Sequence, residues 1–163
     1  MPWIIKQLKE FLTNYKCHHG NLSVENYNGS LLDLSNLFTK SENDLNFPPV
    51  GIIQNSEIEY FLSIKLSGEL FGFYKIVNLD FNNEIELHGS FKSNTNFLIK
   101  YYFELTKIFV LDIQTKFPKK SITSNVSSSN LNVIRFLEYL DFKKQNEILS
   151  ESNKKYFNYL YCP

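Results

Sequence analysis

The sequence predicts a single mixed α/β domain whose central sheet is largely antiparallel, with one parallel pair of strands and helices on both faces. Three observations support this fold class. A chain of 163 residues with 43% hydrophobic residues suits one domain with a substantial core. Short alternating segments, typical of strands, are interspersed with longer segments of helical periodicity. The order of these segments is helix, β, α, β, β, β, α, β, α, β, β, so residues 1–163 are expected to form one domain.

The chain begins with an amphipathic helix over residues 3–15, which carries apolar side chains at helical spacing and polar ones on the opposite face. The apolar stripe includes Trp3, Leu8, Phe11 and Leu12. We expect this stripe to be buried against the domain or a partner subunit, and an external protein partner or a membrane surface is the alternative. We expect residues 1–17, with this helix, to be an addition ahead of the first strand of the sheet.

Three potential metal ligands follow the helix, namely Cys17, His18 and His19. Adjacent histidines project in different directions in regular secondary structure, and no second Cys/His cluster occurs in the chain. A structural zinc site normally needs four ligands. We therefore predict no metal site.

The next elements are short. Residues 22–27 alternate as a strand, and Gly29 ends it. Residues 30–38 carry three leucines and a phenylalanine at helical spacing, which predicts a short helix. The polar segment 39–49 ends in Phe-Pro-Pro, and proline forces the residue before it into an extended conformation. This segment is expected to be a surface loop and a candidate border of a substrate groove.

Three strand-like segments follow at residues 58–66, 70–79 and 84–91. The tight turn Ser67-Gly68-Glu69 between the first two is a hairpin signal, and Asn82-Asn83 makes the next turn. The third segment alternates between an apolar and a polar face. The apolar face has Ile85, Leu87 and Gly89, and the polar face has Glu84, Glu86, His88 and Ser90.

A long helix is predicted over residues 97–117, and Pro118 stops it. Its inward side chains are expected to be Leu98, Tyr101, Tyr102, Leu105, Ile108, Phe109 and Ile113. Residues 121–126 form a short strand. Residues 142–149 and 155–161 close the chain as a second hairpin.

The last helix lies in the segment Asn130–Lys143, NLNVIRFLEYLDFK, where one apolar stripe recurs at helical spacing and Asn130 can cap the first turn. The segment resembles the last helix and following strand of the GNAT superfamily, the acetyl-CoA-dependent N-acyltransferases. Their pattern is Asn-x-x-small-Ile-Arg-x-x-Glu-x-Leu-Gly-Phe, with Asp141 here in place of the glycine. The matching residues are Asn130, Ile134, Arg135, Glu138, Leu140 and Phe142. The order of elements extends the resemblance over residues 21–163.

The resemblance implies where an acyl-CoA would bind. In GNAT proteins it lies where the strand corresponding to residues 84–91 separates from the parallel strand corresponding to residues 121–126. The pantetheine arm pairs with the open strand edge, and the pyrophosphate lies at the N-terminus of the long helix, where unpaired amides and the helix dipole attract anions. The family's glycine-rich phosphate loop corresponds here to a glycine-free stretch, so we expect weak binding of acetyl-CoA. The implied cofactor-binding residues are Gly89, Ser90, Phe91, Lys92, Ser93, Asn94, Thr95, Asn96 and Asn130.

The resemblance also implies the acid–base chemistry. Acyl transfer needs a neutral amine, so a base must remove its proton. Glu86 stands where many GNAT enzymes carry this base, and His88 on the same strand face is the second candidate. Gly89 fits the strand bulge that in the family frees an amide for the thioester oxygen. Leu137 stands where many members carry a proton-donating tyrosine, and Tyr139 is expected to face elsewhere.

Composition restricts the classes of partner and compartment. Basic and acidic residues number 17 each, and no basic stripe typical of a nucleic-acid binder is visible. No apolar run is long enough for a transmembrane helix, and the N-terminus lacks the features of a signal peptide. Two cysteines at opposite ends of the chain favour a reduced compartment, so a cytoplasmic location is expected. The absence of alanine and the single arginine indicate an AT-rich genome, such as that of a biased bacterium, its phage or a protist.

These observations lead to two functional hypotheses. The first is an acetyl-CoA-dependent N-acetyltransferase that acts on an amine of a small molecule or a protein, with a possible homodimer or protein partner. The second is a non-catalytic protein that keeps the GNAT fold for binding or structure, such as a phage virion or host-interaction component. The glycine-free loop and the missing tyrosine favour the second hypothesis, whereas Glu86, Asn130 and the strand order favour the first.

Overall fold

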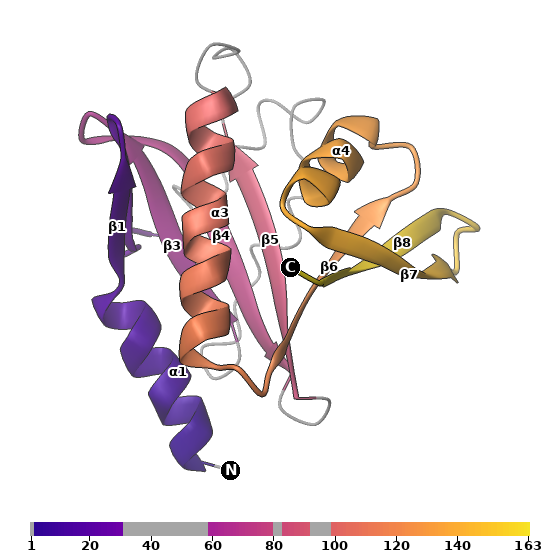
Figure 1. Ribbon diagram of the computed structural model, residues 1–163, viewed down its shortest axis with the longest axis horizontal. Helices are drawn as coiled ribbons and strands as arrows, with labels where there is room; N and C mark the ends of the chain where they lie inside the picture. The colour runs from indigo at the N-terminus through magenta and orange to yellow at the C-terminus, as the bar shows by residue number, and fades with distance from the viewer. Residues whose placement is uncertain (1, 31–58, 80–82, 92–98) are drawn as a thin grey trace.

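The computed structural model describes residues 2–30, 59–79, 83–91 and 99–163, in which eight strands form one sheet (Figure 1). The sheet order is β1-β2-β3-β4-β5-β6-β8-β7. All neighbouring strands are antiparallel except β5 and β6, which confirms the predicted fold class of the sheet. The strands are β1 (Lys16–His19), β2 (Leu22–Asn26), β3 (Glu59–Leu66), β4 (Glu69–Leu79), β5 (Glu84–Phe91), β6 (Ser121–Ser127), β7 (Phe142–Leu149) and β8 (Lys155–Tyr161).

The turn between β3 and β4 is tighter than predicted, because Glu69 already belongs to β4. Only Ser67 and Gly68 connect the strands, and both have positive φ angles, 50° and 88°. Two successive residues of positive φ are the pattern of a type I′ turn, whose twist matches that of a hairpin. Gly68 has the larger φ angle, and this conformation is not strained in glycine because glycine has no Cβ.

Strand β1 was not predicted. It pairs with β2 in a hairpin in which Cys17 lies opposite Val24. His18 is exposed, and His19 on the other side of the strand is half-buried. Within the described ranges no group of three or more His, Cys, Asp or Glu residues is placed to hold a metal ion.

Three described helices pack on one face of the sheet, and Figure 1 shows α3 lying along the strands β3 to β5. They are α1 (Pro2–Asn14), α3 (Ile99–Lys116) and α4 (Leu131–Tyr139). Helix α4 contacts α3 through stacked aromatic rings, with the centroids of Phe103 and Phe136 4.5 Å apart. The predicted helix over 30–38 lies, apart from Ser30, outside the described residues, as does the predicted loop 39–49. The expectation of helices on both faces therefore stays a prediction.

The core lies between the sheet and these helices. The ring of Phe109 on α3 stacks on Tyr74 of β4 with 4.6 Å between centroids, and Tyr15 packs against it at 5.1 Å. Leu8 and Leu12 of α1 are buried in the same cluster and Phe11 packs against it, which confirms for these three residues that the first helix is buried against its own domain. The side chains of residues 2–6 are not described.

Two side chains of α3 predicted to point inward do not. Tyr101 is 44% exposed and Ile108 is 37% exposed. Each precedes by one position a fully buried aromatic residue, Tyr102 or Phe109, and one step along a helix turns a side chain by about 100°. The buried stripe of α3 is therefore narrower than the apolar pattern predicts.

Helix α4 ends where the sequence pattern departs from the GNAT pattern. Asp141 follows the helix with a φ of 68°, in the left-handed region. Glycine adopts this conformation at helix ends most easily, and aspartate is among the side chains that tolerate it. Asp141 therefore occupies the backbone position for which the family pattern has a glycine.

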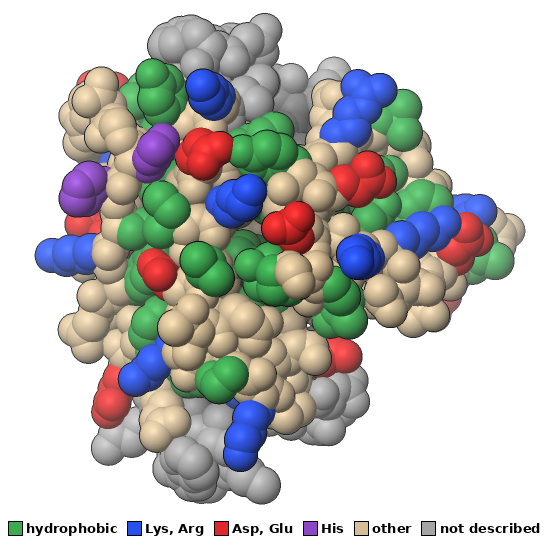
Figure 2. All heavy atoms as spheres, in the orientation of Figure 1, with side chains coloured by type: hydrophobic (Ala, Val, Ile, Leu, Met, Phe, Trp, Pro, Cys, Tyr) green, Lys and Arg blue, Asp and Glu red, His purple; other side chains and the backbone are tan. Residues whose placement is uncertain are grey.

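Figure 2 shows the helical face of the molecule, where acidic and basic side chains are interspersed and do not gather into one charged patch. None of the described helices combines the length and apolar character that crossing a membrane requires.

Candidate active site

Strands β5 and β6 pair with each other at one end and separate toward the other (Figure 1). Their parallel pairing covers three residue pairs, from Glu84 with Ser121 to Glu86 with Thr123. Beyond these pairs, β5 continues to Phe91 beside β4, whereas β6 continues beside β8. This arrangement confirms the predicted parallel pair. We call residues 87–91 the open edge of β5, because no described strand pairs with their β6 side.

Where the two strands separate, a side-chain hydrogen bond links them in place of main-chain pairing. The hydroxyl of Ser124 donates a hydrogen bond to the carbonyl oxygen of Leu87, with 2.8 Å between the oxygens. The Leu87 carbonyl therefore points toward β6. Because the main-chain groups of alternate strand residues point to the same side, those of Gly89 and Phe91 also point to the open edge. An extended ligand with amide groups can pair with them in the manner of an added strand.

The two predicted acid–base residues are in direct contact. Nε2 of His88 lies 2.9 Å from Oε1 of Glu86, and both side chains are 18% exposed. They lie on the face opposite the helices, because the alternate residues Ile85 and Leu87 are buried in the helical core.

The ionisation of Glu86 follows from its surroundings. The hydrogen bond from His88 is the largest cause that holds the pKa of Glu86 below its ordinary value, although burial acts in the opposite direction. Glu86 is therefore ionised at neutral pH. An ionised carboxylate only accepts hydrogen bonds, so Nε2 of His88 is the donor.

Sequence reasoning missed two further neighbours of Glu86. Nδ2 of Asn125 on β6 donates to Oε1 of Glu86 at 3.0 Å. Lys75 on β4 lies opposite His88 in the strand register, and its charge also lowers the pKa of Glu86. Lys75 is only 8% exposed and forms an ion pair with Glu59 at 3.3 Å. The available signal was an asparagine and a lysine inside strands, where both residue types are depleted.

The predicted bulge at Gly89 is wrong. Strands β4 and β5 pair in one unbroken register, in which Gly89 lies opposite Tyr74. A close approach of side chains from α3 and β4 explains why position 89 is a glycine. A Cβ at this position would lie 2.8 Å from the hydroxyl oxygen of Tyr102 and 3.3 Å from the ring of Tyr74. Helix α3 therefore packs directly on the main chain of β5 beside its open edge.

Gly89→Ala should destabilise the protein by about 1–3 kcal/mol, because the new methyl group overpacks this contact. Tyr102 is 1% exposed and packs against Tyr74 and Phe136, so its hydroxyl has little room to retreat. Urea unfolding measures the effect. In a Tyr102→Phe background, which lacks the hydroxyl, the same substitution should cost less. An equal cost in both backgrounds would contradict this account of the glycine.

The predicted phosphate-binding segment lies outside the described residues, and its role stays a prediction. This applies to Lys92, Ser93, Asn94, Thr95 and Asn96. Ser90 and Phe91 are described as main chain of β5 only.

Helix α4 has no tyrosine at position 137, where many GNAT members carry one. Leu137 is 4% exposed and packs in the core. Tyr139 lies on the outer side, 41% exposed, and its hydroxyl donates to Glu104 of α3. Asn130 caps the helix as predicted, because its Oδ1 accepts a hydrogen bond from the N–H of Val133 at 3.3 Å. Its role in cofactor binding stays a prediction.

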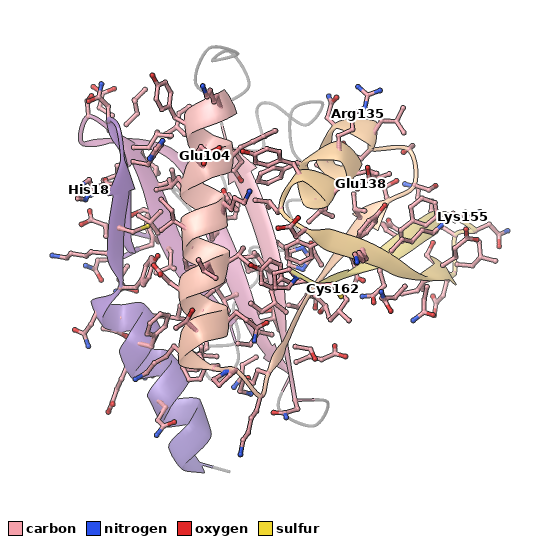
Figure 3. The ribbon with its side chains drawn as sticks, in the orientation of Figure 1. His18, Glu104, Arg135, Glu138, Lys155 and Cys162 are labelled. Carbon is pink, nitrogen blue, oxygen red and sulfur yellow. The ribbon has the colours of Figure 1, made fainter. Side chains whose placement is uncertain are left out.

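The residues that match the GNAT pattern divide into two groups. Leu140 and Phe142 are buried in the core, and Ile134 packs against it. Arg135 and Glu138 are exposed, and Figure 3 shows Arg135 pointing outward from α4. The apolar part of the pattern therefore positions the helix on the sheet.

The sequence matches no family model and no curated protein. Solved structures do match over most of their length. An acetyltransferase of the GNAT family from Bacillus anthracis superposes with a TM-score of 0.69 at 12% identity, over 90% of this chain and 97% of that one.

Two further matches have different acceptors in their names. For a ribosomal-protein-S5-alanine acetyltransferase from Vibrio fischeri the TM-score is 0.67 at 8% identity, over 92% of this chain and 100% of that one. For a mutant of a spermidine N-acetyltransferase from Vibrio cholerae the TM-score is 0.66 at 12% identity, over 87% and 94%. The protein has the GNAT fold.

Proposed function

We propose that this protein is an acetyl-CoA-dependent N-acetyltransferase that acts on an amine of a small molecule or a protein. The observation that carries the proposal is the Glu86–His88 pair beside the open edge of β5. The GNAT fold supports it, because the structures that match include enzymes named for a polyamine and for a protein acceptor. At these identities the likeness shows the fold, so the choice between the two kinds of acceptor stays open.

The open edge fits the pantetheine arm of acetyl-CoA. The main-chain groups of Gly89 and Phe91 point to this edge, and amide groups of an extended arm can pair with them. The bound acetyl-CoA would supply an activated acetyl group as its thioester. Helix α3 begins at Ile99, after the segment that contains Lys92, and the N-terminus of a helix favours phosphate groups.

The Glu86–His88 pair would accept the proton of the attacking amine. An amine of the lysine type has a pKa of about 10.4 and is protonated at neutral pH, so it must lose a proton before it can attack. Glu86 is ionised and lies within 2.9 Å of His88, so a proton taken up by His88 would be stabilised by the neighbouring carboxylate. Glu86 remains the first candidate for the base and His88 the second.

With Leu137 in place of the tyrosine that many GNAT members carry, departure of the thiolate would rely on its own stability. A free thiol has a pKa of about 8.5, which makes its thiolate a tolerable leaving group near neutral pH. The buried Leu137 predicts a slower enzyme, and it leaves the reaction feasible.

Titration with acetyl-CoA should raise the melting temperature. We expect a dissociation constant on the order of 10⁻⁴ M, or about −5.5 kcal/mol. Ligand at ten times this concentration then stabilises the fold by about 1.4 kcal/mol, which corresponds to roughly 3–6 °C for a domain of this size. Differential scanning fluorimetry measures the shift, with ADP as the control for binding of the nucleotide part alone.

The absence of both a thermal shift and a calorimetric heat at millimolar acetyl-CoA would reject the enzyme proposal. The chain would then be treated as a GNAT scaffold kept for binding, which is the alternative that the buried Leu137 favours. A shift with ADP equal to that with acetyl-CoA would assign the binding to phosphate recognition without the pantetheine edge.

A further inference from the structure

A chain of side-chain hydrogen bonds leads from the far side of the separating strands to Glu86. Asn125 of β6 and Asn158 of β8 lie directly opposite each other in the strand register. Nδ2 of Asn158 donates to Oδ1 of Asn125 at 2.8 Å. Nδ2 of Asn125 then donates to Oε1 of Glu86 at 3.0 Å. We call Asn158, Asn125 and Glu86 the relay.

Two facing asparagines are unusual occupants of these positions. Strands favour β-branched and aromatic side chains, and asparagine is depleted in them. In β8 the residues around Asn158 follow this preference, since Tyr156, Phe157, Tyr159, Leu160 and Tyr161 are all aromatic or aliphatic. Both asparagines are half-buried, where a polar group needs a partner to offset its loss of water. Their partners here are each other and Glu86.

The relay has a fixed direction. The ionised carboxylate of Glu86 can only accept, so Asn125 must present its NH₂ group to it. The carbonyl oxygen of the same amide then faces β8, where the NH₂ group of Asn158 occupies it. An amide that turned over would place an oxygen against the carboxylate and an NH₂ group against another NH₂ group.

We propose that Asn125 and Asn158 are positioning residues of the acyl transfer, which hold the Glu86 carboxylate in place by fixing the direction of the Asn125 amide. The inference rests on the proposed function and extends it from β5 across to β6 and β8. Asn125 contacts the carboxylate directly, and Asn158 acts through Asn125.

The relay acts on Glu86 together with the titratable groups around it. In the described part of the chain these are His88 on the same strand and Lys75 on β4, whose charge is shared with Glu59 on β3. From β6 and β8 the groups that face Glu86 are neutral, namely Thr123, its partner in the strand register, and the amides of the relay. The contribution of the amides can therefore be tested without removing a charge.

Asn158→Asp should disrupt the relay. An ionised Asp side chain cannot donate to the oxygen of the Asn125 amide, and it competes with Glu86 for the NH₂ group of that amide. The hydrogen bond that stabilises the charged form of Glu86 is then weakened, and this raises the pKa of Glu86. Carboxyl ¹³C NMR of the intact protein should show the titration midpoint of Glu86 rising by about 1 pH unit.

The chain offers a matched control in Asn146 of β7, which lies opposite Asn158 on the other side of β8. Asn146→Asp adds the same charge one strand farther away and leaves the relay intact. Its effect on the Glu86 midpoint should be below about 0.2 pH units, because a more distant exposed charge is screened. Equal shifts in the two variants would overturn the proposal, since charge alone would then explain them.

Asn125→Leu removes the donor to Glu86 without adding a charge, and it tests the proposal if Asn158→Asp fails to fold. The Glu86 midpoint should again rise by about 1 pH unit, and an unchanged midpoint would overturn the proposal. The acid limb of kcat/KM should move with the midpoint, while KM for acetyl-CoA stays constant. If the unsubstituted protein transfers no acetyl group, the proposed function fails, whereas the NMR titration still decides whether the relay exists.

Discussion

Glu86→Gln should lower the turnover number at neutral pH by about 10²–10⁴-fold. Glutamine keeps the shape of the side chain and an oxygen that can accept from Asn125 and His88, but it cannot take a proton from the amine. The affinity for acetyl-CoA should stay nearly constant, because the proposed pairing edge consists of main chain at Gly89 and Phe91. Steady-state kinetics with detection of the released thiol measures the turnover number, and titration calorimetry measures the affinity.

Glu84→Gln is the matched control for this experiment. Glu84 lies on the same strand and the same face, two residues before Glu86 and at the end where β5 is still paired with β6. Its substitution should leave the turnover number unchanged. Unaltered turnover in Glu86→Gln would remove Glu86 from the mechanism, and a loss confined to His88→Gln would assign the base to the imidazole.

Leu12→Ala should destabilise the protein by about 2–5 kcal/mol. Leu12 is 1% exposed on α1 and belongs to the core cluster beneath the helices, so truncation leaves a cavity in the domain. The loss is a large fraction of the stability of an ordinary domain, about 5–15 kcal/mol. Chemical unfolding of the two proteins in urea gives the difference in free energy.

Leu111→Ala is the control, because it deletes the same atoms from a helical leucine that is 54% exposed. Surface substitutions usually change stability by less than about 0.5 kcal/mol. If Leu12→Ala cost no more than Leu111→Ala, α1 would not be an integral part of the fold, and a role toward an external partner would be favoured.

The sequence predicted the first and last residues of some strands correctly and missed one strand, β1. The strands β5, β7 and β8 have the predicted bounds. Alternation delimits β5, and the turn residues 150–153 separate β7 from β8. Strand β1 has only four residues and contains two adjacent histidines, a residue type that also suggests a metal ligand. Alternation over so short a segment carries little information, and the strand is defined by its pairing with β2.

The sequence predicted the part of the candidate site that lies on a single strand. Glu86 and His88 are two residues apart, so the period of a strand suffices to place them on one face. Asn125 and Asn158 come from β6 and β8, and their register with β5 depends on the point where the parallel strands separate. The role of Gly89 was assigned wrongly for a related reason, since the hydroxyl that requires it belongs to α3.

The sheet consists of two parts, β1 to β5 and β6 to β8, whose main chains pair through three residue pairs at one end. Two side-chain hydrogen bonds add to this link, one from Ser124 to Leu87 and one from Asn125 to Glu86. On the helical side, α3 and α4 meet through the rings of Phe103 and Phe136. Because so little main chain joins the two parts, the angle between them depends on these side-chain contacts.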